Sequence, residues 1–169
     1  AHLFIELDGS FIPFSINEIR SFSKNVLIVK LKEINSEKEA DEVVYNQPAG
    51  HVEVNETLIE AAEREVLEET GWEAEITGFL GIYHYTSNKT GICYVRHLFV
   101  ASADNFRADI ELDKDIIDTC WMSIEEAKAV KDQMRSPLVL QNLNDFKERN
   151  HYPLSLISPR CWRDFNHEC

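Results

Sequence analysis

The segment from residue 55 to residue 70 has the hydrophobic period of an amphipathic helix, and such a helix must bury one side in a core. Its apolar side is a single stripe, made by Ile59, Ala62, Val66 and Thr70. We predict Asn55 as the N-cap, and Gly71 follows at the position where helices commonly end in a left-handed residue. The chain must therefore fold with other elements packed along this side of the helix.

The rest of the helix surface is strongly acidic. The segment from Gly50 to Trp72 contains seven Glu and one Arg, a local charge of −6 out of a net charge of −13. At about 100° per residue, three of these carboxylates share one face: Glu65, Glu68 and Glu69. Like charges at this spacing each cost a few tenths of a kcal/mol, and no Lys or Arg follows four residues later to offset them. A local rule broken repeatedly at one place indicates a functional site.

Carboxylates on one helical face can converge on a hard divalent cation, because Mg²⁺ and Mn²⁺ prefer oxygen ligands. The acidic face therefore predicts a Mg²⁺ or Mn²⁺ site. The alternative is a solvated charged face, which is what most runs of charge are and which suits any single Glu taken alone. It explains the whole set poorly.

The length of 169 residues is typical of one domain, and we expect a single domain over residues 1–169. No run approaches the roughly 18 apolar residues of a membrane helix, so no membrane partner is expected. The net charge of −13 argues against binding of a nucleic-acid polymer. An anionic substrate would need a bound metal to bring it in.

Cysteine usage and the N-terminal residues suggest a cytoplasmic protein. The four cysteines form no C-x-x-C pair and have no His at zinc-ligand spacing, so we expect free thiols at Cys93, Cys120, Cys161 and Cys169. Residues 1–6 lack the cationic start and long apolar stretch of a signal peptide.

Strands are expected to alternate with helices along the chain. The predicted strands are residues 25–31, 43–45, 76–85, 93–101 and 119–122, with a hairpin at 3–14 and a solvated loop at 32–42. A capping box at Ser123 and Glu126 opens a second helix, and Ser136 followed by Pro137 opens a third. This alternation predicts a mixed α/β sandwich.

The acidic segment also resembles a known family. Nine residues match every fixed position of the Nudix box, G-x5-E-x7-R-E-U-x-E-E-x-G-U with U apolar: Gly50, Glu56, Arg64, Glu65, Val66, Glu68, Glu69, Gly71 and Trp72. The resemblance implies a Nudix hydrolase with an α/β fold, an α/β/α sandwich around a central mixed β-sheet. In such an enzyme this loop and helix hold Mg²⁺ on the diphosphate of a small phosphorylated substrate.

The resemblance assigns roles residue by residue. It implies metal ligands at Glu65, Glu68, Glu69 and the backbone carbonyl of Gly50, with Arg64 and Glu56 as a pair that orients them. Glu56 is placed about 180° around the helix from Glu65, which argues against Glu56 as a ligand beside it.

Outside the box, residues 46–51 and 135–139 resemble the NudJ-type phosphatases, a Nudix subgroup that removes phosphate from nucleoside di- and triphosphates and from the thiamine-pyrimidine pyrophosphate. The resemblance covers residues 43–157, whereas residues 1–24 and 158–169 match poorly. Substrate contacts are expected at Tyr45, Gln47, His51 and Arg135. For Arg135 a surface position beside an ordinary helix start explains the sequence equally well, and for Tyr45 a core position is the usual alternative.

The general base is the least constrained role. Glu68 and Glu69 belong to the metal cluster, and three aspartates precede the strand at 119–122: Asp113, Asp115 and Asp118. We take Asp115 as a candidate catalytic residue, with simple solvation of the loop as the alternative. The other candidate catalytic residues are Arg64, Glu65, Glu68 and Glu69.

Several substrates and states stay open at this stage. Nucleotide sugars and dinucleoside polyphosphates are alternative substrates, and a non-catalytic nucleotide-sensing module is a second alternative, although it predicts a damaged box. RNA decapping would require a basic surface for the RNA, and the net charge of −13 argues against one. A monomer and a homodimer are both compatible with the sequence.

Overall fold

The computed structural model describes residues 4–7, 10–13, 25–35, 40–88, 91–148 and 151–160. The strands are β1 (Phe4–Leu7), β2 (Ser10–Pro13), β3 (Asn25–Asn35), β4 (Ala40–Asn46), β5 (Trp72–Thr86), β6 (Cys93–Phe106) and β7 (Ile116–Ser123). The helices are α1 (Leu58–Thr70), α2 (Ile124–Ala129) and α3 (Leu138–Glu148), with short 3-10 turns at Lys131–Gln133 and Leu154–Leu156.

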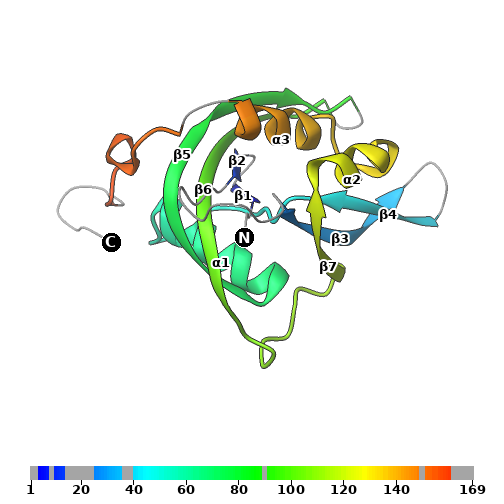
Figure 1. Ribbon diagram of the computed structural model, residues 1–169, viewed down its shortest axis with the longest axis horizontal. Coiled ribbons are helices and arrows are strands. Elements are labelled where there is room, and N and C mark those ends of the chain that lie inside the picture. The colour runs from blue at the N-terminus through cyan, green and yellow to red at the C-terminus, as the bar shows by residue number, and fades with distance from the viewer. Residues whose placement is uncertain are drawn as a thin grey trace.

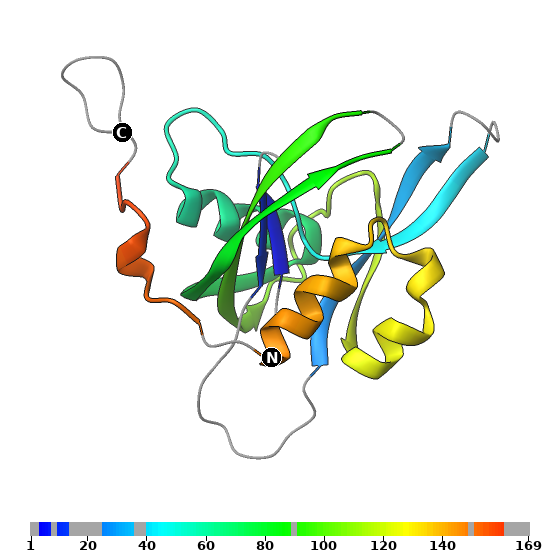
Figure 2. The ribbon, with the colours of Figure 1, turned by 90° about the horizontal axis from the view of Figure 1, so that it is seen from above.

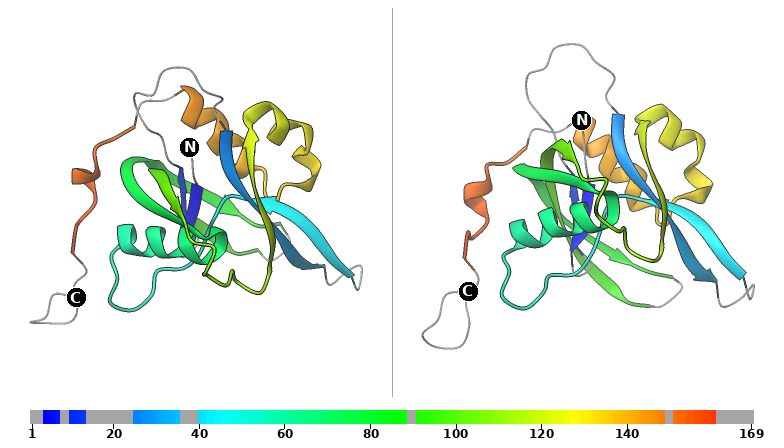
Figure 3. Two further views of the ribbon diagram at one scale, coloured as in Figure 1. Left: turned by 60° about the horizontal axis from the view of Figure 1, so that its bottom comes forward. Right: turned by 90° about the horizontal axis from the view of Figure 1, so that it is seen from below.

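The described strands pair in three antiparallel groups. β5 and β6 form a long hairpin, β3 lies between β4 and β7, and β1 pairs with β2. The β1–β2 hairpin lies against β6, and α1 packs on β5. Figures 1 and 3 show α1 and α3 on opposite sides of the strands, with β1–β2 between them. This is the expected α/β class; the one parallel contact between the described segments is a single bridge from Tyr45 to Met134.

One core joins the layers. Its fully buried side chains come from β3, α1, β6 and α3 and include Leu27, Val66, Leu98, Phe99, Val139 and Leu143. The predicted inward residues of α3, which are Val139, Leu143 and Phe146, are all buried. Burial of apolar side chains therefore holds α1 and α3 in place, rather than the polar residues on their surfaces.

The N-terminus of α1 differs from the prediction. Thr57 is the N-cap and forms a capping box with Glu60, in which the Glu60 amide donates to the Thr57 hydroxyl at 3.2 Å and the Thr57 amide donates to Glu60 at 2.7 Å. Asn55 cannot serve because its φ of 79° is left-handed, whereas an N-cap residue is extended. The helix therefore begins at Leu58, and Glu56 lies in the preceding loop instead of opposite Glu65 on the helix. The predicted cap at the other end is confirmed, because Gly71 has φ 72° and donates to the carbonyl of Leu67.

The predicted loop at residues 32–42 is wrong for the described residues. β3 continues to Asn35 and β4 begins at Ala40, because the two strands pair through registers such as Lys32 with Val43. The turn predicted at Asp8-Gly9 lies outside the described residues. β5, β6 and β7 are also longer than predicted, since pairing extends each strand beyond its apolar run.

The predicted cap of α2 is present in the structure, whereas a cap of α3 by the Ser136 side chain is not. The capping box of Ser123 and Glu126 is confirmed at the start of α2. The Ser136 hydroxyl does not cap α3, because it is buried and hydrogen-bonds no protein group in the described part of the chain.

Among the described residues, no helix has both the length and the apolar character needed to cross a membrane. Cys93 and Cys120 are free thiols, and Cys161 and Cys169 lie outside the described residues.

Candidate active site

The loop between β4 and α1 runs alongside α1 (Figure 2). Its closest approach is at Gly50, where an added Cβ atom would overlap the carboxylate of Glu65, far inside van der Waals contact. One residue earlier, the amide of Ala49 donates to the carboxylate of Glu69 at 2.8 Å. Glycine is therefore required at position 50 because the Glu65 carboxylate fills the space of a side chain.

Arg64 joins the loop to the helix. Its Nε and Nη2 atoms donate to the two oxygens of Glu56 at 3.0 and 2.8 Å, a bidentate pair, and Nη2 also donates to the carbonyl of His51 at 2.8 Å. The hydrogen bond from Arg64 lowers the pKa of Glu56. The pairing expected between Arg64 and Glu56 is thus present, although it links the helix to the loop rather than two positions on the helix.

Arg64 also contacts two of the expected metal ligands. Its Nη1 donates to Glu65 at 2.9 Å and to Glu68 at 2.8 Å. Arg64 therefore offsets part of the negative charge of the acidic face, and it lies four positions before Glu68 rather than four positions after it.

Glu69 is half-buried, whereas Glu65 is buried. Burial raises the pKa of Glu69 well above the usual range, and the neighbouring charges of Glu65 and Asp113 act in the same direction, opposed by the Ala49 amide and Arg135. Burial also raises the pKa of Glu65, although Arg64 opposes the shift. Two carboxylates of this face therefore have a poor environment for negative charge, which a bound cation would improve.

The three carboxylates do not converge as predicted. In the ranges that the structure describes, no three Asp, Glu, His or Cys side chains lie close enough together to hold one ion. The physical reason is that Glu69 accepts from the Ala49 amide, whereas Glu65 and Glu68 share the Nη1 atom of Arg64. The donor set still fits a hard cation, because carboxylate oxygens and the Gly50 main chain lie on one side of the helix and no Cβ stands between them.

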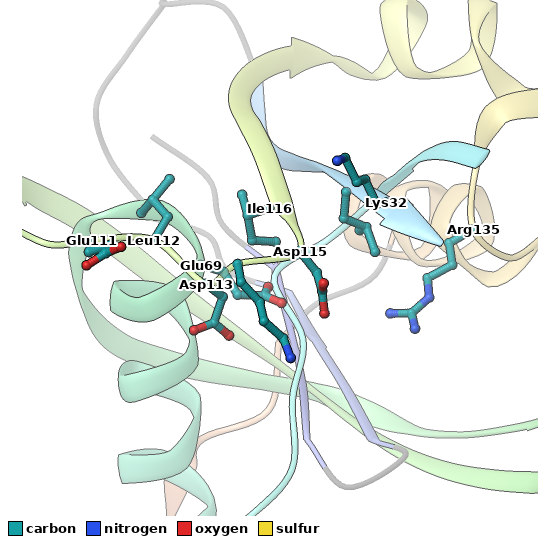
Figure 4. A pocket seen from close by; sticks show the side chains of 10 residues that line it. Lys32, Glu69, Glu111, Leu112, Asp113, Asp115, Ile116 and Arg135 are labelled. Atoms are coloured by element: carbon teal, nitrogen blue, oxygen red, sulfur yellow. The ribbon is translucent and has the colours of Figure 1, made fainter. Parts of the chain in front are cut away.

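A cavity of about 590 Å³ opens beside Glu69 (Figure 4). It is lined by Leu31, Lys32, Glu69, Glu111, Leu112, Asp113, Lys114, Asp115, Ile116 and Arg135. The carboxylates of Glu69, Asp113 and Asp115 lie along one part of its wall, and the guanidinium of Arg135 faces them from the other (Figure 4). The cavity thus combines acidic groups suited to a metal with a cation suited to phosphate.

Backbone hydrogen bonds hold the aspartate loop in place. The Asp113 amide donates to the carbonyl of Glu68 at 3.1 Å, and the Lys32 amide donates to the carbonyl of Asp115 at 2.9 Å. Asp113 and Asp115 therefore line the cavity, whereas Asp118 does not and instead accepts from the adjacent Thr119 amide. Lys32 and Lys114 were missed by sequence reasoning, since single lysines in a strand and a loop carry no pattern.

The four residues expected to contact the substrate lie in different environments. Arg135 is exposed, lines the cavity and is held by its amide, which donates to the carbonyl of Tyr45 at 2.9 Å. His51 has an exposed side chain outside the cavity wall, and Tyr45 packs against the core. Gln47 is completely buried and its Nε2 atom donates to the carbonyl of Val139 at 3.4 Å, so the expectation of a substrate contact at Gln47 is corrected.

Comparison with known proteins identifies the family. The NUDIX domain model matches residues 15–143. The chain belongs to the Nudix family. It is 37% identical over 121 residues to the phosphatase NudJ of Escherichia coli K12, covering 70% of this chain and 76% of that protein. This Nudix protein is therefore a hydrolase acting on phosphorus-containing anhydrides.

Solved structures support the same fold. A NUDIX hydrolase from Nitrosomonas europaea superimposes with a TM-score of 0.77 at 30% identity, over 98% of this chain and 97% of that one. The Nudix domain of Shewanella oneidensis NrtR, solved with ADP ribose, gives a TM-score of 0.57 at 15% identity over 87% and 86% of the two chains. A Caenorhabditis elegans Ap4A hydrolase gives 0.55 at 18% identity over 86% and 90%. The last two likenesses concern the fold alone.

Proposed function

We propose that this Nudix hydrolase is a Mg²⁺-dependent phosphohydrolase of nucleoside di- and triphosphates or related small pyrophosphates, such as the thiamine-pyrimidine pyrophosphate. The observation that carries the proposal is the shared cavity of Glu69, Asp115 and Arg135 beside the box helix. The likeness to the phosphatase NudJ supports release of a terminal phosphate. Mn²⁺ is the natural substitute for Mg²⁺, because it accepts the same oxygen ligands.

The proposed metal ligands are Glu65, Glu68, Glu69 and the carbonyl of Gly50. Bound Mg²⁺ would supply charge neutralisation for the phosphoryl oxygens and a lowered pKa for an attacking water. Arg64 holds Glu65 and Glu68 and is itself held by Glu56, so this pair limits how far the carboxylates can move.

Arg135 and Asp115 supply the remaining roles. Arg135 binds the terminal phosphate through charged hydrogen bonds from its guanidinium. Asp115 accepts the proton as water attacks phosphorus and the bond to the leaving oxygen breaks, so no covalent intermediate is required. Lys32 and Lys114 add positive charge at the rim of the same cavity. Together these cations let an acidic protein accept an anionic substrate.

Metal dependence tests the proposed function. We expect release of inorganic phosphate from GDP, GTP or thiamine-pyrimidine pyrophosphate with Mg²⁺ or Mn²⁺, and no turnover in excess EDTA. UDP-glucose and Ap4A belong in the same panel because nucleotide sugars and dinucleoside polyphosphates are the alternative substrates. Turnover that persists in EDTA, or strong preference for UDP-glucose or Ap4A, would reject the proposal. Tight nucleotide binding without any turnover would favour the sensing module instead.

Replacement of Arg135 by Ala tests the phosphate contact. We expect kcat/KM on GDP and GTP to fall. The fall should correspond to a loss of roughly 1.5–3 kcal/mol of transition-state stabilisation, the range for a lost hydrogen bond to a charged group. Mn²⁺ binding to the free enzyme should be unchanged. Steady-state kinetics and a Mn²⁺ titration measure the two quantities.

Arg107→Ala is the matched control for Arg135→Ala. Arg107 is a partly exposed arginine that pairs with Glu73 and Asp109 away from the cavity. Its loss should leave the kinetics unchanged. Equal kcat/KM for Arg135→Ala and the wild type would return Arg135 to the ordinary surface.

A further inference from the structure

The chain from Tyr45 to Gly50 is held by contacts from both halves of the site. At one end, the Tyr45 carbonyl accepts from the Arg135 amide at 2.9 Å. At the other end, the Ala49 amide donates to Glu69 at 2.8 Å, and Gly50 lies against Glu65. This segment therefore connects the proposed metal ligands on α1 with the proposed phosphate contact before α3.

Gln47 lies in the middle of this connection. Its side chain is completely buried, and its Nε2 atom donates to the Val139 carbonyl in the first turn of α3 at 3.4 Å. No protein group among the described residues hydrogen-bonds its Oε1 atom. A buried amide that is satisfied on one side only is destabilising, and an apolar side chain of the same length would avoid this cost.

The cost of this amide indicates a role beyond filling space. An apolar side chain packs without direction, whereas a hydrogen bond to a carbonyl fixes both distance and orientation. The bond from Gln47 links this loop to α3 through a side chain, at a position two residues before Ala49 and three before Gly50. A shift of the loop relative to α3 would therefore change the position of Gly50 relative to Arg135.

We propose that Gln47 is a positioning residue, whose bond to α3 sets the separation between the divalent-cation ligands and the phosphate-binding Arg135. This inference rests on the proposed function. It reassigns Gln47 from substrate contact to support of both subsites, and it predicts that loss of the amide weakens metal binding and substrate binding together.

The test compares two completely buried amides, one on the loop and one on α3. Gln47→Met keeps the length of the side chain and removes its donor. Asn142→Leu is the matched control, because Asn142 is also completely buried, lies on α3 and has neither polar atom hydrogen-bonded to a described protein group. Free Mn²⁺ measured by its EPR signal gives metal affinity without requiring activity, and circular dichroism reports folding.

We expect Gln47→Met to be folded and to bind Mn²⁺ about tenfold more weakly, the usual lower range for groups that support metal ligands. Its KM for the best substrate of the panel should rise at least about fivefold, by more than kcat falls, because Arg135 is displaced. Asn142→Leu should change neither quantity by more than about twofold. A purely structural role for Gln47 would change the melting temperature of Gln47→Met and leave its Mn²⁺ binding unaltered.

Folded Gln47→Met with wild-type Mn²⁺ affinity overturns the proposal, and so does equal weakening in Asn142→Leu. If Gln47→Met does not fold, Gln47→Asn, which shortens the side chain by one methylene, is judged by the same two measurements. A wild-type protein that binds Mn²⁺ but hydrolyses no member of the panel refutes the proposed function alone, and Mn²⁺ affinity then decides the role of Gln47. A wild-type protein that binds no Mn²⁺ refutes both.

Discussion

Replacing Glu69 by Gln should lower kcat by at least about a hundredfold while the protein remains folded. The amide keeps the shape of the carboxylate and can still accept the hydrogen bond from Ala49, but it removes a charged metal ligand. Stability should hold or rise without metal, because the Glu69 carboxylate has a raised pKa and its ionised form is therefore disfavoured in the folded state. Steady-state kinetics with Mg²⁺ and urea denaturation in EDTA measure the two effects.

Glu63→Gln is the control for this result. Glu63 lies on the same helix, burial raises its pKa, and its carboxylate accepts from a backbone amide, that of Ile76 at 3.2 Å. It lies outside the cavity wall and outside the contacts of Arg64. Its replacement should leave kcat within about twofold of the wild type. An active Glu69→Gln variant, or one that unfolds, would contradict the assignment of Glu69 as a ligand.

The sequence predicted those parts of the fold that depend on local chemistry. The left-handed cap at Gly71 and the capping box of Ser123 and Glu126 are set by residues within one turn of each other. The inward residues of α3 follow from the helical period alone. The N-cap of α1 was misassigned because Asn55 and Thr57 are both good caps, and only the glutamate three residues after Thr57 distinguishes them.

Features that depend on distant pairing could not be predicted. The polar residues 32–35 form a strand because β4 supplies backbone partners, and nothing in their own composition indicates it. Likewise, the helical period placed three carboxylates on one face but gave no sign that Arg64 would hold two of them. Lys32 and Lys114 reach the cavity from separate segments, so their part in the site is visible only in three dimensions.

The site was predictable to the extent that one helix carries it. Glu65, Glu68 and Glu69 follow from spacing, and their support by Arg64 follows from the Nudix box. Gln47 shows the limit of this reasoning: the same short segment that resembles the NudJ-type phosphatases suggested a substrate contact, yet its side chain is inside the protein. A sequence pattern can indicate that a residue is important, but it does not show whether the side chain faces the substrate or the protein interior.

Replacing Gly50 by Ala should abolish most activity although it adds a single methyl group. Its backbone φ is not in the left-handed region, so alanine is conformationally allowed and the effect comes from overlap with the Glu65 carboxylate. Either Glu65 must leave its position or the loop must move away from α1, and both outcomes separate the proposed ligands. We expect Mn²⁺ binding at least about tenfold weaker and kcat/KM at least about a hundredfold lower. EPR titration with Mn²⁺ and steady-state kinetics measure these losses.

Gly78→Ala separates the loss of a ligand geometry from a general loss of packing. A Cβ at Gly78 would meet the Cβ of His151 at 3.2 Å, a tight contact at a position that does not line the cavity. This variant should lose stability, by about 1–3 kcal/mol as overpacked sites do, and keep the Mn²⁺ affinity of the wild type. If Gly50→Ala behaves in the same way, with lower stability and intact metal binding, then the contact between Gly50 and Glu65 is structural and the carbonyl of Gly50 is not a ligand. If only Gly50→Ala loses the metal, the absence of a side chain at this position is what allows the loop and the helix to share one cation.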